Sequence, residues 1–330
     1  MISMEGSPDS PCLDFSLVIP VYNEEAVLPL LFKRLYSVLD QLGRPCEVIF
    51  VDDGSRDRSA VLLREQYQRT PHVTRVVLLQ FNCGQHNAII AGFMRARGRY
   101  VITLDADLQN PPEELGKLLA AMDQGFDYVG TIRRQRRDVI WRHWASLLIN
   151  GLRERITSIR MTDHGCMLRG YHRNIIKAIL ASQESITFIP ALAYLFAGNA
   201  TEIHVEHEER AAGVSKYSLT KLVRLNFDLM TGFSNAPLQI FSIIGIGISL
   251  ASLVFVLYMA WRRLVIGPEV EGVFTLFAIL FFLVGISLFG IGLLGEYIAR
   301  IYQQTRERPR FMVREFLGDP EQNPDGRGGA

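Results

Sequence analysis

Two closely spaced carboxylates, Asp105 and Asp107, directly follow the apolar run Tyr100 to Leu104. If this segment is extended, the alternation of side chains turns both carboxylates to the same side. Such a pair suits Mg²⁺ or Mn²⁺, which takes one or two protein carboxylates and completes its coordination shell with water and diphosphate oxygens. Aspartates are also common at strand ends and helix caps, so the D-x-D spacing alone does not establish a metal site.

A second set of polar side chains follows two earlier apolar runs. The set consists of Asp52 and Asp53 in FVDDGSRDRS, and of Pro20, Tyr22 and Glu24 in VIPVYNEE. Carboxylates at these places can accept hydrogen bonds from a nucleobase imide and from ribose hydroxyls. Helix capping and turn formation explain single residues of the set but do not explain why all of them fall at strand ends.

These residues must be positioned by the regular elements around them. Short apolar runs at residues 17–21, 47–51, 73–79 and 100–104 alternate with helical patterns at residues 24–42, 57–69, 86–97 and 112–124. This alternation predicts an α/β fold, with a mostly parallel sheet and helices on both faces. Such sheets bind ligands at the carboxyl ends of their strands, where the carboxylates lie.

Composition limits the possible partners. The chain has 330 residues, of which 48% are apolar, and its 35 Lys+Arg against 34 Asp+Glu leave a net charge of +1. Because no global field attracts polyanions, we expect no nucleic-acid partner. Four cysteines without a C-x-x-C pair argue against a disulfide framework and against a zinc site.

Two uncharged apolar runs, Leu238 to Trp261 and Val273 to Gly295, account for the high apolar content. As helices of about 35 Å, each is long enough to cross a hydrocarbon core of about 30 Å. A buried hairpin of a soluble domain is the alternative, although core helices of this length normally keep a polar face. Basic residues flank the pair on both sides, and no signal sequence is visible, so we expect both flanks in the cytoplasm.

The motifs VIPVYNEE, VDDGSRD, FNCGQHNAIIAGF and DADLQNPPE resemble those of the family 2 glycosyltransferases of GT-A fold. Later segments, including EERAAGVSKYS and the second apolar run, resemble the polyprenyl-phosphate glycosyltransferases that carry a C-terminal membrane hairpin. The resemblance extends from about residue 15 to residue 314. It implies a UDP-sugar donor, undecaprenyl phosphate as acceptor and inversion at the anomeric carbon. Glucosyl or mannosyl transfer to a polyprenyl phosphate is the alternative.

The same resemblance implies roles for individual residues. Pro20, Tyr22, Glu24, Asp52 and Asp53 hold the uridine, Asp105 faces the ribose or diphosphate, Asp107 with Asp105 holds the metal ion, and Gln109 lines the donor-sugar site. Arg210 matches a mobile arginine that covers the diphosphate, and Lys216 lies beside it in the sequence. Asp163 matches an acid of the acceptor-side motif, either as a base or as a group that positions substrate.

Transfer to a lipid phosphate requires cationic side chains that bind the acceptor more than it requires a general base. A lipid phosphomonoester has a second pKa of about 6 and is already a nucleophilic dianion at neutral pH. It requires cationic side chains that bind it in line with the anomeric carbon. We expect Arg133 and Arg136, together with Lys216, to bind this phosphate. A solvated positive patch, or contact with anionic lipid headgroups, is the alternative for these basic residues.

The expected organisation follows from these assignments. A flexible N-terminus (1–14) precedes a GT-A domain (15–214), an interfacial amphipathic helix (215–235), a transmembrane hairpin (236–297, with spans 238–261 and 273–295) and a cytoplasmic tail (298–330). Residues 140–156 form a second amphipathic pattern, for which a core-facing helix is the alternative. We expect a multi-pass, homo-oligomeric protein of the bacterial inner membrane that contacts its lipid and has a cytoplasmic catalytic domain.

Overall fold

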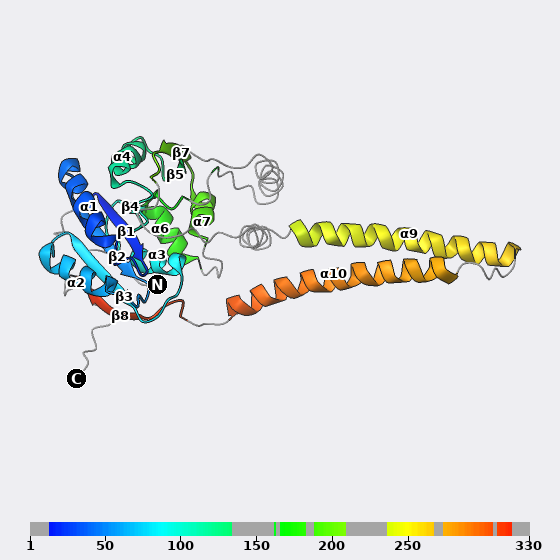
Figure 1. Cartoon of the computed structure of the whole chain (residues 1–330). Helices are drawn as coiled ribbons and strands as arrows, with labels where there is room; N and C mark the ends of the chain where they lie inside the picture. The colour runs from blue at the N-terminus through cyan, green and yellow to red at the C-terminus, as the bar shows by residue number, and fades with distance from the viewer. Residues whose placement is uncertain are drawn as a thin grey trace. The chain divides into compact units, whose positions relative to one another are not determined.

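The computed structural model describes residues 13–133, 162, 166–182, 188–208, 236–266, 273–305 and 309–318. Its strands are β1 (Phe15–Val21), β2 (Cys46–Asp52), β3 (Thr74–Leu79), β4 (Tyr100–Thr103), β5 (Tyr128–Arg133), β6 (Arg169–His172), β7 (Ala200–Val205) and β8 (Val313–Leu317). They form one sheet in the order β7-β5-β6-β4-β1-β2-β3-β8 (Figure 1).

Helices connect and flank these strands. They are α1 (Leu28–Leu42), α2 (Ser59–Arg69), α3 (Gln85–Phe93), the 3₁₀ turn η1 (Pro112–Glu114), α4 (Leu115–Asp123), α6 (Arg173–Ala181) and α7 (Ile189–Phe196). The four strands and four helices expected before residue 125 are confirmed, with shifts of up to four residues at their ends. The fold class is confirmed as well.

The centre of the sheet is parallel and buried on both faces. Strand β1 pairs in parallel with β2 and β4, and β2 pairs in parallel with β3. Continuous burial along these strands explains why they read as apolar runs rather than as alternating ones. Since Val21 is opposite Asp52, and Asp52 is opposite Leu78, the carboxyl ends of three strands meet at one edge.

The edge strand β8 is the largest difference from the expected organisation. Residues 298–330 were expected to form a tail apart from the GT-A domain, yet β8 pairs antiparallel with β3 inside that domain's sheet (Figure 1). Arg64 of α2 donates to Glu315 at 2.6 Å, which fixes β8 against the helix beside it. A short strand with one apolar face gives little periodic signal, and its partner β3 is far away in the sequence.

The apolar runs form two long helices, α9 (Ala236–Ile266) and α10 (Val273–Thr305), in a second compact unit. Within the described residues one segment, Phe282–Ala299, is long and apolar enough to cross a membrane, and Leu238–Ile248 is a shorter apolar stretch. The helices contact each other where Phe241 lies over Gly290, at which an added Cβ would come within 2.2 Å of the ring. A small residue there allows close packing of the two helices.

Candidate functional site

The candidate site lies at the edge of the sheet where the carboxyl ends of β1, β2 and β3 meet. Asp52 is the last residue of β2. Its side chain is completely buried, and Oδ2 accepts the Ser55 N–H at 3.3 Å. Within the described part of the chain, Oδ1 of Asp52 has no hydrogen-bond partner. Burial raises the pKa of Asp52 above its ordinary value, and the hydrogen bonds from Ser55 oppose that rise. A buried carboxylate oxygen without a partner is costly, so it is suited to accept a hydrogen bond from a ligand.

The neighbouring Asp53 uses both of its carboxylate oxygens to hold a loop. Oδ1 accepts the Cys83 N–H at 2.7 Å, and Oδ2 accepts the Gly84 N–H at 3.0 Å. Burial raises the pKa of Asp53, while these two hydrogen bonds favour its charged form. The end of β2 is therefore tied to the loop that follows β3.

The loop after β1 is crosslinked to the loop after β2. Asn23, at a φ of 55°, donates its N–H to Ser55 Oγ at 2.9 Å, and its Oδ1 accepts the Arg56 N–H at 2.9 Å. The Glu24 N–H donates to Ser59 Oγ at 2.9 Å. These bonds place Pro20, the exposed Tyr22 and Glu24 at the same edge as Asp52 and Asp53, as the sequence predicted.

The carboxylates of the D-x-D segment lie in a turn rather than in a strand. Strand β4 ends at Thr103, and Leu108 adopts a φ of 59°, so the period-two argument for Asp105 and Asp107 was wrong. Asp105 Oδ1 accepts the Gln85 side-chain amide at 2.6 Å. Asp107 is buried, and its Oδ1 accepts the Gln109 N–H at 3.1 Å. Both carboxylates are thus oriented by hydrogen bonds at the same edge of the sheet.

The half-buried Gln109 joins this turn to the end of β7. Its carbonyl oxygen accepts the Glu208 N–H at 2.9 Å. Glu208 in turn receives Arg34 Nη1 at 2.9 Å, and the same guanidinium donates to Glu113. Arg34 thereby lowers the pKa of Glu208. This ion pair fixes Glu208, the last described residue before residues 209–235.

Of the residues predicted to bind the acceptor, the structure describes only Arg133. Arg133 is the last residue of β5, is half-buried, and is opposite Val205 of β7. Arg136, Asp163, Arg210 and Lys216 lie outside the described residues, as do the amphipathic stretches 140–156 and 215–233. Their assigned roles stay predictions.

Several supporting residues were not singled out from the sequence. Gln85 holds Asp105, and the N–H groups of Cys83 and Gly84 hold Asp53. Gly84, at a φ of 89°, precedes α3 in the motif FNCGQHN, so a glycine before a helical pattern was the available signal. Backbone donors carry no side-chain signature, which is why the loop itself could not be recognised.

A buried arginine lies next to this region. Arg169 is completely buried, and its Nε donates to the Cys166 carbonyl at 2.7 Å while Nη1 donates to the Tyr128 hydroxyl. Burial, followed by the charge of Arg169, lowers the pKa of His86 to about 4. His86 is consequently neutral at physiological pH and supplies no cation for a diphosphate.

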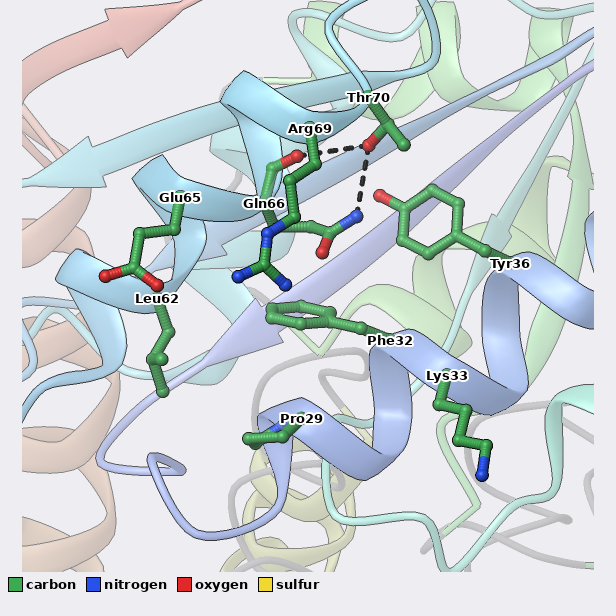
Figure 2. A pocket seen from close by; sticks show the side chains of 9 residues that line it. All are labelled: Pro29, Phe32, Lys33, Tyr36, Leu62, Glu65, Gln66, Arg69 and Thr70. Atoms are coloured by element: carbon green, nitrogen blue, oxygen red, sulfur yellow. Dashed lines mark hydrogen bonds between the residues drawn. The ribbon is translucent and has the colours of Figure 1, made fainter.

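A cavity of about 500 Å³ lies between α1 and α2 (Figure 2). Phe32, Tyr36 and Leu62 line it, and Gln66 and Thr70 hydrogen bond to each other in its wall. No residue predicted for the site lines this cavity. The candidate site is therefore the carboxylate edge.

Comparison with known proteins identifies the class to which this fold and site belong. The model of glycosyl transferase family 2 matches residues 16–180, and the model of the GtrB C-terminal hairpin matches residues 236–301. Two relatives are named undecaprenyl-phosphate 4-deoxy-4-formamido-L-arabinose transferase. The protein of Pseudomonas aeruginosa strain LESB58 is 50% identical over 92% of this chain and 90% of its own length. That of Edwardsiella ictaluri is 51% identical over 92% and 94%.

The chain belongs to glycosyl transferase family 2, and it is a glycosyltransferase with a GT-A fold. More distant similarity extends to solved structures. Glucosyl-3-phosphoglycerate synthase from Mycobacterium tuberculosis, in complex with Mn²⁺, UDP and phosphoglyceric acid, is 16% identical over 67% of this chain and 77% of that chain, with a TM-score of 0.47. Staphylococcus aureus TarS with UDP-GlcNAc is 19% identical over 66% of each chain, with a TM-score of 0.42.

Proposed function

We propose that the protein transfers 4-deoxy-4-formamido-L-arabinose from its UDP-linked donor to undecaprenyl phosphate, with inversion at the anomeric carbon. The observation that carries this function is the identity of about 50% to transferases of that name, which spans both the GT-A domain and the C-terminal hairpin. The product serves lipid A modification and hence resistance to cationic antimicrobial peptides such as polymyxin. Glucosyl or mannosyl transfer to a polyprenyl phosphate is the alternative.

The donor nucleotide fits the edge formed by β1 and β2. Oδ1 of Asp52, which has no hydrogen-bond partner among the described residues, is suited to accept the imide N–H of uracil, which a cytosine base lacks. Pro20, Tyr22 and Glu24 line the same edge, and Asp53 holds the loop beside it. The exposed ring of Tyr22 offers a face on which the base can stack.

A divalent cation, Mg²⁺ or Mn²⁺, fits at Asp107 and Asp105. No group of three or more ligating side chains occurs among the described residues, which agrees with an ion held by one or two carboxylates and by substrate phosphates. When bound, the cation neutralises charge on the departing UDP. Hydrogen bonds from Gln109 and Gln85 orient the two carboxylates. We assign Gln109 to the donor-sugar site.

For the acceptor we assign basic residues at the carboxyl end of β5 and beyond it. Arg133 and Arg136, with Lys216, bind the lipid phosphate, and Arg210 covers the diphosphate of the donor. The position of Arg133 at a carboxyl end of the sheet supports this division. Asp163 belongs to the acceptor side, as a base or as a positioning group. The phosphate dianion is itself the nucleophile, so the main task of the protein is to align it with the anomeric carbon.

Substituting lysine for arginine distinguishes the role proposed for Arg133 and Arg136 from the role proposed for Arg210. Bidentate contacts between arginine and phosphate are geometrically demanding, so lysine does not restore them. Arg133→Lys and Arg136→Lys are expected to raise the KM for lipid by about tenfold with unchanged UDP affinity, whereas Arg210→Lys mainly lowers turnover. Calorimetric titration with UDP and lipid-dependent kinetics measure both effects. Loss of UDP binding in an Arg133 or Arg136 variant that keeps its lipid dependence contradicts the assignment.

The sheet itself supports a hairpin that crosses the membrane twice. Strand β7 precedes α9, β8 follows α10, and both strands belong to one sheet, which lies on one side of a bilayer. Seven residues separate Thr305 from Val313, and the eight steps between the two residues span at most about 29 Å when extended, less than a hydrocarbon core of about 30 Å. If α10 spans the inner membrane, the chain must therefore cross it an even number of times. We propose this hairpin, in a homo-oligomer, with the catalytic domain cytoplasmic.

Cysteine labelling tests this topology. In a variant without native cysteines, Pro268→Cys is expected to react with an impermeant thiol reagent in intact inner-membrane spheroplasts, because the turn reaches the periplasm. Ala330→Cys is expected to stay unlabelled until the membrane is permeabilised. Labelling of Ala330→Cys from the outside contradicts the model.

Product analysis tests the activity directly. Purified protein in detergent is incubated with undecaprenyl phosphate and a panel of UDP- and GDP-sugars, and the glycolipid is identified by mass. The expected product carries the formamido pentose. A product formed from UDP-glucose or GDP-mannose instead supports the alternative, and the absence of any glycolipid from this panel contradicts both.

A further inference from the structure

The strand β8 contacts the loop that holds Asp53. The backbone N–H of Gln80, the residue after β3, donates to the Met312 carbonyl oxygen at 2.9 Å, and Leu79 is paired with Val313. The start of the short segment from Gln80 to Cys83 is thus fixed by the residue that precedes β8.

The same segment determines where Asp53 lies. Asp53 accepts N–H groups from Cys83 and Gly84, and Gly54 is packed against the backbone of Phe81. A displacement of this segment therefore moves the donors that hold the Asp53 carboxylate and the wall behind Gly54. Through these contacts the position of the Asp53 carboxylate, at the end of β2, depends on the position of Met312.

A β-bulge interrupts the pairing of β8 with β3 beside this loop. Leu78 is paired with Glu315 and Leu79 with Val313, so Arg314 is an extra residue on β8. Bulges redirect side chains and are frequent beside active sites. The charge of Arg314 acts on Asp52 and opposes the rise of its pKa caused by burial.

Specific side-chain contacts fix β8 in this position. Glu315 pairs with Arg64 of α2 at 2.6 Å, and the guanidinium of Arg95 lies 4.7 Å from the centre of the Phe316 ring. Leu317 packs against the hydrophobic core. The strand is held by charge, by a cation–π contact and by apolar burial, so it is an integral part of the domain.

We propose that the segment Met312–Leu317 is a positioning element of the donor-nucleotide site, so that binding of UDP depends on the chain that follows α10. The segment acts through the Gln80–Gly84 loop on Asp53. This inference rests on the proposed function of that edge as the UDP site.

Two truncations of the full-length protein test the proposal. A chain that ends after residue 308 lacks β8, and the matched control ends after Gly318 and keeps it. We expect the first to bind UDP at least about tenfold more weakly by calorimetry, with a KM for undecaprenyl phosphate within about twofold of normal, and the control to be unchanged. Thermal melting monitors folding. A folded chain without β8 that binds UDP normally overturns the proposal.

Point variants decide the case if the shorter chain does not fold. Glu315→Arg, which places like charges against Arg64, is expected to weaken UDP binding by about threefold or more, and the double variant Arg64→Glu/Glu315→Arg to restore it. The matched control, Asp123→Arg against Arg44, breaks an exposed ion pair outside the site and is expected to leave UDP affinity unchanged. An unaltered affinity in Glu315→Arg, or equal losses in both variants, overturns the proposal.

Asp52→Ala separates failure of this inference from failure of the proposed function. If Asp52→Ala binds UDP normally, the edge is not the donor site and the function assigned to it falls. If Asp52→Ala loses UDP while the β8 variants retain it, the donor site stands and the inference alone is wrong.

Discussion

Replacing Asp107 by asparagine is expected to lower turnover by at least about a hundredfold and to abolish the stimulation of activity by divalent cations. Asparagine keeps the size of the side chain and can still accept the Gln109 N–H through its carbonyl oxygen. It loses the negative charge that a hard cation requires. Loss of charge neutralisation on the departing UDP costs several kcal/mol of transition-state stabilisation, from which the rate effect follows.

Activity is measured over a series of Mg²⁺ and Mn²⁺ concentrations, and UDP affinity is measured with and without metal. Without metal, Asp107→Asn and the wild type are expected to bind UDP equally well, and only the wild type gains affinity when metal is added. Asp40→Asn, on the exposed side of α1, is the control for the charge change and should retain full turnover. Near-normal turnover of Asp107→Asn with an unchanged metal response contradicts the assignment.

The second large effect is expected for Gly54→Ala. Gly54 has a φ of 68°, and a Cβ there would lie 2.5 Å from the carbonyl carbon of Phe81 and 2.7 Å from the backbone nitrogen of Asn82. The left-handed conformation costs an alanine about 1 kcal/mol, and the overlap with backbone forces a shift that costs about 1–3 kcal/mol more. We expect a loss of about 2–4 kcal/mol in the free energy of unfolding, together with weaker UDP binding.

Gly43→Ala is the matched control. Gly43 has a similar φ of 58° at the end of α1, but nothing lies within 4 Å of its added Cβ. It should therefore show the conformational cost alone and bind UDP normally. Denaturant unfolding and calorimetry measure both quantities. Equal destabilisation of the two variants contradicts a role for the contact between Gly54 and Phe81.

The core of the site could be predicted because its residues follow buried strands directly. Asp52 and Asp53 end a continuous apolar run, and the ends of β1 and β2 are level in the sheet, so their shared location follows from parallel pairing. The geometry within each loop could not be predicted in the same way. Asp105 and Asp107 lie in a turn with Leu108 in a left-handed conformation, which leucine rarely adopts and no pattern in the sequence indicates.

Long-range contacts were the other part that the sequence did not disclose. Arginine is usually found at the protein surface. Arg169 is nevertheless completely buried against Tyr128, because β6 lies between β4 and β5. Strand β8 was assigned to a tail because the hydrophobic hairpin separates it from β3. In both cases the deciding contact joins segments that local periodicity does not connect.

The place of β8 also determines the order in which this protein can fold. Strand β3 is synthesised early, and its pairing partner Val313–Leu317 only after both α9 and α10 have been made. Until then the outer edge of β3 has unpaired backbone groups, which are a template for wrong pairing with other chains. A ribosome that has completed the sheet's centre therefore carries a domain with an open edge until α9, α10 and β8 have been made. Chaperone demand during biogenesis is expected to rise with the time that this edge stays unpaired.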